Sequence, residues 1–247
     1  MQANKIVIRC KNCTQVFSGH YCNHCGQDAH TGEIDFHFLM HEIQHGLLHV
    51  DKGLLFTVKE LFIRPGHMLR EFIAGKRVKH FKPLAFLLII AGLDAFINHY
   101  LHLSSFIPID AKNPGVNNVI EQVNEWSAHH YLLLMLVQLP LLSYVFYLFF
   151  RKYKTGYLAQ LVINVYLSGQ KILIRLILFP LLSLVPGGSV LNNLLIPLGL
   201  SIWAYSQFYH KESRWTIIKR AFLGYAAFYI LDVVLLSILL TIMENIS

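Results

Sequence analysis

Residues 130–150 read HYLLLMLVQLPLLSYVFYLFF, a stretch without a single Asp, Glu, Lys or Arg. About 20 consecutive apolar residues suffice for a helix to cross the hydrocarbon core of a bilayer. Four further apolar stretches of comparable length lie at residues 83–103, 157–185, 190–209 and 221–243. The sequence therefore predicts an all-α polytopic membrane protein with about five transmembrane helices. The stretch 157–185 is longer and more polar than one span requires, so we expect it to be tilted, broken or interfacial at its start.

The composition of the chain agrees with a membrane protein. Of the 247 residues, 55% are hydrophobic and 14% are charged, and the mean hydropathy is +0.47. Soluble domains carry about 25% charged residues. This balance excludes a disordered chain and disfavours a soluble enzyme or a nucleic-acid-binding protein, although the net charge is +7.

The positions of Lys and Arg predict the orientation of the chain. They gather in residues 64–82, 151–154 and 211–220, whereas residues 104–129 contain a single Lys and the tail after residue 243 contains no basic residue. Cytoplasmic flanks of spans are enriched in Lys and Arg. We therefore expect a cytosolic N-terminus and a C-terminus on the outer side of the membrane. The lipid bilayer then accounts for the positive charge, and no nucleic acid is expected.

All four cysteines lie in residues 1–30, as two C-x2-C pairs formed by Cys10, Cys13, Cys22 and Cys25. Four thiolates at this spacing can close a tetrahedron around one Zn²⁺, and they leave no open position for catalysis. Two disulfides are disfavoured by the expected cytosolic location, and a redox C-x-x-C by the absence of a βαβ pattern. The segment is predicted to be a cytosolic zinc ribbon with one structural zinc, suited to docking a protein partner or a second copy of the chain.

Residues 31–82 are predicted to be an amphipathic, histidine-rich connector at the cytoplasmic membrane face. Apolar residues at helical spacing over residues 34–63 indicate two helices broken near Gly53, and a third short helix follows at His67–Ala74. The segment is too polar to span a membrane, so we expect interfacial helices.

The connector places His37, His41, His45 and His49 along one helix face, with Glu42 completing a match to H-E-x-x-H. Three interpretations remain open. A plain polar helix face is favoured; His41, His45 and His49 forming a second, noncatalytic metal site or a pH sensor is next. A metallopeptidase zinc site with Glu42 as general base is the third, although the extended motif requires a glycine where this chain has Leu48.

The first 100 residues resemble a family of uncharacterised bacterial membrane proteins that is known only as a domain of unknown function with an N-terminal zinc ribbon. The resemblance rests on Cys22 to Gln27 (CNHCGQ), on Asp51 to Gly53, on Arg64 to Gly66 and on Gly75 to Arg77 before Pro83. The resemblance implies a protein of the bacterial inner (cytoplasmic) membrane with a similar architecture, in which the C-terminus would be periplasmic. It brings no known activity. It also leads us to expect an acidic residue and a histidine at the start of the third span, where this chain has Gln160 and Leu161.

Five polar residues fall inside the expected spans: Asp94, Asn164, Lys171, Arg175 and Asp232. Charges in a bilayer must be paired, protonated or exposed to water. They predict either an intramembrane polar site that lines a transport path or structural pairing. The expected function is a noncatalytic membrane component that docks or assembles through its zinc ribbon. The alternatives are a channel or transporter that uses Asp94, Asp232 and Lys171, and the HExxH metallopeptidase.

Overall fold

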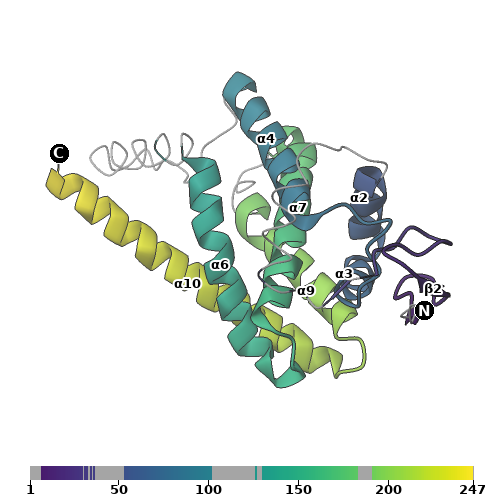
Figure 1. The fold of residues 1–247 in the computed structure, drawn as a ribbon. Coiled ribbons are helices and arrows are strands. Elements are labelled where there is room, and N and C mark those ends of the chain that lie inside the picture. The colour runs from purple at the N-terminus through teal and green to yellow at the C-terminus, as the bar shows by residue number, and fades with distance from the viewer. Residues whose placement is uncertain are drawn as a thin grey trace.

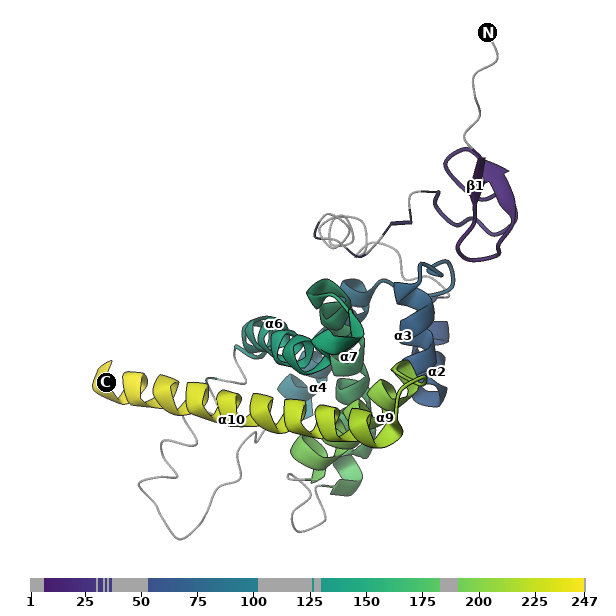
Figure 2. The ribbon, with the colours of Figure 1, turned by 90° about the horizontal axis from the view of Figure 1, so that it is seen from below.

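The computed structural model describes residues 7–29, 31–32, 34, 36, 53–101, 126, 130–182 and 191–246. This part of the chain is mostly helical, with one small two-stranded sheet near the N-terminus (Figure 1). The sheet and its loops lie to one side of the helices, on the side away from the C-terminal end (Figure 2).

The sheet belongs to the cysteine-containing segment. Strands β1 (Val7–Arg9) and β2 (Val16–Ser18) pair antiparallel, with Ile8 opposite Phe17. Successive side chains of a strand point to opposite faces. Phe17 accordingly packs against Cys10 and Cys22, while Val7 and Val16 are exposed on the other face.

Two short helices follow, α2 (Gly53–Ile63) and α3 (Pro65–Ile73). Pro65 suits the first turn of α3 because the first backbone N–H groups of a helix have no intrahelical acceptor. After Ile73 the chain leaves the helix through Gly75, which has a positive φ of 96° and donates its N–H to the carbonyl of Phe72, while the N–H of Lys76 donates to the carbonyl of Glu71. These helices agree with the two expected after Gly53; the expected helix before Gly53 lies almost entirely outside the described residues.

The apolar part of the chain contains five α-helices, one 3₁₀ turn and one π turn among the residues described. They are α4 (Pro83–Leu101), α6 (Tyr131–Phe150), η1 (Arg151–Tyr153), α7 (Tyr157–Leu182), η2 (Leu191–Leu195), α9 (Ile196–Phe208) and α10 (Arg214–Ile246). Within the described ranges, two segments are long and apolar enough to cross a membrane, Leu133–Tyr153 and Tyr157–Leu181, and Pro83–Ile97 is a shorter apolar helix.

Three of the expected segments differ from the observed helices. Helix α7 is continuous, because the polar side chains that suggested a break are buried against neighbouring helices. The stretch 190–209 is irregular: a π turn leads into α9, and Pro197 occupies the first turn of α9. Helix α10 begins at Arg214, before the expected start at residue 221.

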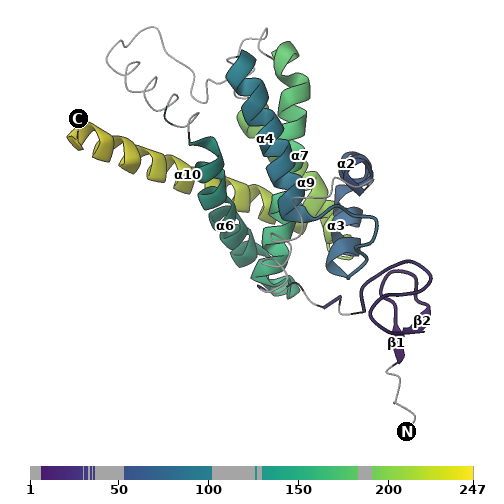
Figure 3. The ribbon, with the colours of Figure 1, turned by 45° about the horizontal axis from the view of Figure 1, so that its top comes forward.

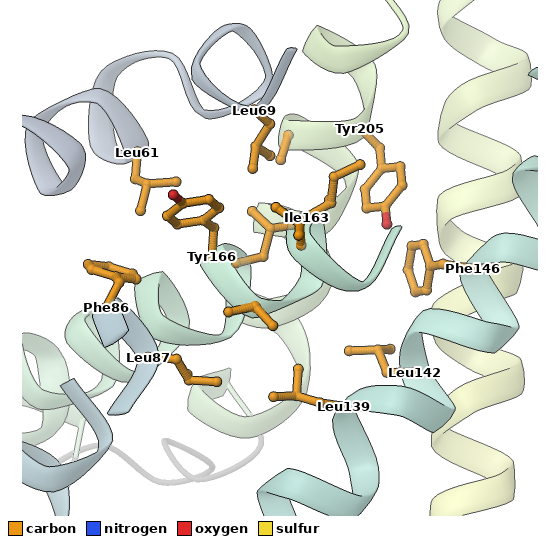
Figure 4. Close-up of a cluster of buried hydrophobic side chains, with 14 of the residues drawn as sticks. Leu61, Leu69, Phe86, Leu87, Leu139, Leu142, Phe146, Ile163, Tyr166 and Tyr205 are labelled. Atoms are coloured by element: carbon orange, nitrogen blue, oxygen red, sulfur yellow. The ribbon is translucent and has the colours of Figure 1, made fainter. Parts of the chain in front are cut away.

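Helix α7 forms the centre of the bundle and contacts α2, α4, α6 and α9, while α10 crosses α6 and α9 (Figures 1 and 3). Tyr166 of α7 is fully buried among Leu61, Phe86 and their neighbours, and Tyr205 of α9 lies against Phe146 of α6 (Figure 4). The connector helices are thus part of the same packed core as the apolar helices.

Candidate metal centre and polar contacts of the helices

The thiols of Cys10, Cys13, Cys22 and Cys25 converge on one point. Their four Sγ atoms all lie within 4.8 Å of one another, and the four cysteines are not joined by disulfides. The Sγ atoms of Cys10 and Cys25 are 3.5 Å apart, as are those of Cys13 and Cys22. Zn–S bonds of about 2.3 Å in a tetrahedron would place the sulfur atoms roughly 3.8 Å apart. The four cysteines can therefore hold a metal ion, and their number and spacing fit tetrahedral zinc.

Each cysteine pair lies in a tight turn with the same backbone hydrogen bonds. The N–H of Cys10 donates to the carbonyl of Gln15, and the carbonyl of Cys10 accepts from the N–H of Thr14. Cys22 makes the equivalent bonds with Gln27 and Gly26. Both turns require a left-handed residue after their second cysteine: Thr14 has φ 66° and Gly26 has φ 74°. Glycine adopts this conformation at no steric cost, and a β-branched residue does not. These backbone hydrogen bonds and left-handed turns orient the four thiols toward one another.

The second turn of the ribbon connects directly to the helices. Gln27 is buried, its Oε1 accepts from the backbone N–H of Arg77 at 3.2 Å, and its amide nitrogen donates to Thr31. The Arg77 guanidinium in turn donates to the carbonyls of Phe72 and Gly32, each at 3.2 Å. Gly75 lies against the ribbon, since a Cβ there would come within 2.7 Å of the Lys11 side chain. The loop between α3 and α4 is therefore held by the cysteine-containing segment.

The five polar residues expected inside the spans have different partners in the structure. Asp94 of α4 is fully buried and is paired with Arg175 of α7. Asp232 of α10 accepts a hydrogen bond of 2.7 Å from Gln138 of α6. The ammonium of Lys171 lies 5.4 Å from the ring centre of Tyr225 on α10.

The fifth residue, Asn164, belongs to a buried polar network that the sequence analysis missed. Tyr205 donates to Gln160 at 2.7 Å and lies 3.4 Å from the Asn164 oxygen, while Asn164 donates to Ser143. Gln160 also donates to Tyr209, whose hydroxyl donates to Thr155 at 2.9 Å. A hydrophobicity pattern cannot reveal such a network, because its members come from three helices.

The histidine motif cannot be placed. His37, His41, Glu42, His45 and His49 all lie outside the described residues. The second metal site and the metallopeptidase therefore remain predictions from sequence.

Comparison with known proteins gives one partial match. A family model described as "Protein of unknown function (DUF3667)" matches residues 51–93, which run from the start of α2 through α3 into α4. This segment includes the α3–α4 loop that contacts the ribbon. No curated protein and no solved structure matches the chain.

Proposed function

We propose that the chain is an integral protein of the bacterial inner membrane with about five spans, in which a structural zinc ribbon acts as a noncatalytic docking or assembly module. Four cysteine ligands would occupy all tetrahedral positions, so the zinc would supply folding free energy to the ribbon and no chemistry. The hydrogen bonds that Arg77 donates to Gln27 and Gly32 carry the proposal. Through them the metal-dependent fold would hold the loop that leads into the first apolar helix.

The surface of the helices supports a membrane location. Large apolar side chains are more than half exposed on each long helix, among them Phe96, Val137, Ile177 and Ile230. Soluble monomers rarely expose contiguous apolar surface on this scale. Lipid would cover these side chains.

The predicted orientation also gains support from the fold. Arg70 precedes the first apolar helix, Lys152 and Lys154 follow α6, and Lys211 precedes α10. These residues come from all three basic regions of the sequence and line the same cavity. The three regions therefore lie at one end of the molecule, as a common cytoplasmic side requires.

A docking role requires a free surface on the ribbon. Val7 and Val16 are each more than 60% exposed on the sheet face opposite Phe17 and the cysteines, and Tyr21 of the ribbon is also more than 60% exposed. We propose that this face binds a partner protein or a second copy of the chain.

Site-specific photocrosslinking tests docking in membranes. A crosslinker at Val16 should give a discrete adduct that is lost when Val7 and Tyr21 are changed to Ser, with the zinc content unchanged. A crosslinker at exposed Lys59 of α2 is the control. Equal, diffuse labelling at both positions would contradict a docking face on the ribbon.

A channel or transporter is the second candidate. Burying the Asp94–Arg175 pair between α4 and α7 costs desolvation free energy, and ionisable residues inside membrane helices mark ion or substrate paths. Against a single path, Asp94, Lys171 and Asp232 contact different partners. Flux measured in proteoliposomes should fall in Asp94→Asn and Asp232→Asn variants if the chain transports ions. Flux that is absent, or equal in all three proteins, would exclude this function.

A further inference from the structure

A cavity of about 500 Å³ opens where three distant parts of the chain meet. Its walls come from α3, from the turn between α6 and α7, and from the turn between α9 and α10. Figure 1 shows the latter two turns at the same end of the bundle.

The lining of this cavity is strongly basic. Arg70, Lys152, Lys154 and Lys211 share the lining with one carboxylate, that of Glu212, so the lining residues carry an excess of three positive charges when His210 is counted as neutral. Glu71, which lies outside the lining, offsets part of the charge of Arg70. Within the described parts of the chain, no carboxylate lies within ion-pair distance of the three lysines. Uncompensated like charges around one concavity repel one another, so an anion in the cavity would stabilise the folded protein.

The walls of the cavity are fixed by contacts within the bundle. The guanidinium of Arg70 donates to the carbonyls of Gln207 and Phe208 at the end of α9, the latter at 3.1 Å. The rings of Tyr153 and Tyr209 lie 4.9 Å apart, and the Tyr209 hydroxyl is held by Thr155. The lysines, by contrast, are exposed and can turn toward a ligand.

We propose that this cavity binds a phosphate-bearing anion. Lysine ammonium groups bind phosphate as point charges, and basic pockets between helices on the cytoplasmic side of membrane proteins take phosphorylated head groups. The volume leaves room for a larger group beside the phosphate, which the rings of Tyr153 and Tyr209 would contact.

Two sources can supply this chemistry. An anionic phospholipid would place its head group in the cavity from the surrounding bilayer, and this source rests on the proposed membrane location. Trp215, which is 73% exposed at the start of α10, is of the type that anchors helices at membrane interfaces. A soluble phosphorylated compound would enter from the aqueous side and requires no membrane.

The test compares two matched triple variants of the full-length protein in neutral detergent. One changes the cavity residues Lys152, Lys154 and Lys211 to Gln; the control changes Lys59, Lys79 and Lys219, which are equally exposed and lie outside the cavity. Binding of phosphatidylglycerol, of phosphatidylcholine and of glycerol 3-phosphate is measured for each protein at constant ionic strength. Thermal unfolding confirms that both variants fold.

Each lysine should contribute roughly fivefold to the affinity, so the cavity variant should bind the phosphate probe about 100-fold more weakly. The control variant should bind like the unchanged protein. Loss confined to phosphatidylglycerol identifies a lipid head group, and loss confined to glycerol 3-phosphate identifies a soluble ligand. Equal weakening of binding in both variants would overturn the proposal. So would a protein that binds phosphatidylglycerol no more tightly than phosphatidylcholine and does not bind glycerol 3-phosphate. Failure of membrane insertion would remove only the lipid source, because the soluble probe tests the cavity independently.

Discussion

Gly26 and Thr14 show how single residues determine the geometry of the cysteine site. Both occupy the left-handed position after the second cysteine of a pair, and one of them is a β-branched residue in a conformation that such residues rarely adopt. The turn at Thr14 is therefore strained, whereas the turn at Gly26 is not. The Thr14 hydroxyl bonds to the carbonyl of Cys13 at 2.6 Å and compensates part of this cost.

Replacing Gly26 with Ala should destabilise the ribbon by about 1 kcal/mol. No atom lies within 4 Å of the added Cβ, so the cost arises from the backbone conformation alone. Competition with a zinc chelator measures the effect, and Thr14→Gly is the matched control that should bind zinc at least as tightly. Identical zinc affinity in Gly26→Ala and the unchanged protein would show that the turn is not held in this conformation.

His80 lies in the loop before α4 with its ring edge-on to Phe56 and Phe72. Burial lowers the pKa of His80 below its ordinary value, and the nearby carboxylate of Glu71 opposes this shift only in part. The folded protein therefore binds a proton at this ring less readily than the unfolded chain does. Stability should fall as the pH drops below about 6.5, by about 1.4 kcal/mol for each unit by which the pKa is lowered.

The variant His80→Phe should remove this part of the acid sensitivity. Glu60 and Arg64, whose charges also act on the His80 ring, remain in place in this variant. The difference in stability between the two proteins therefore isolates the effect of the imidazole. Thermal unfolding midpoints between pH 8 and pH 5 measure it. Parallel pH profiles for the two proteins would contradict a buried, neutral His80.

At the scale of elements, the contact between α3 and α9 depends on a glycine. A Cβ at Gly66 would lie 2.4 Å from the carbonyl oxygen of Ala204 and 2.4 Å from the backbone nitrogen of Phe208. These are backbone atoms and cannot give way independently of the helix. The Gly66 N–H also donates to the side chain of Gln207 at 3.1 Å, so the close approach includes a hydrogen bond.

Gly66→Ala should therefore separate α3 from α9 and destabilise the protein by roughly 2–3 kcal/mol, as overpacking of a close contact does. Gly199→Ala is the control, because it lies in α9 itself with no atom within 4 Å of the new Cβ. That substitution should be neutral or slightly stabilising. The unfolding midpoint in detergent distinguishes the two, and equal midpoints would contradict the packing of α3 on α9.

Helix α7 illustrates which parts of the site sequence reasoning could predict. Asn164, Lys171 and Arg175 recur at intervals of seven and four residues, which places them on one helix face. A rise of about 1.5 Å per residue separates them by roughly 6 to 16 Å along the axis, so each meets a different partner. The pattern of one helix cannot specify those partners.

At the scale of the whole molecule, local patterns predicted the mostly helical fold and the cysteine cluster because both depend on neighbours in the sequence. The contact between Gln27 and Arg77 spans 50 residues, and the cavity unites α3 with two turns more than 75 residues further along the chain. Such long-range contacts leave no periodic signal. Their residue types were visible, since Gln27 and Arg77 lie within the motifs quoted for the family resemblance, but their proximity was not.

The most direct test of the account is the zinc content per chain of the full-length protein purified in detergent, measured by elemental analysis beside a variant with Cys10, Cys13, Cys22 and Cys25 changed to Ser. The geometry of the four thiols predicts one zinc per chain that is absent from the variant. Protein without zinc, or one zinc retained after removal of all four cysteines, would contradict a ribbon held together by metal.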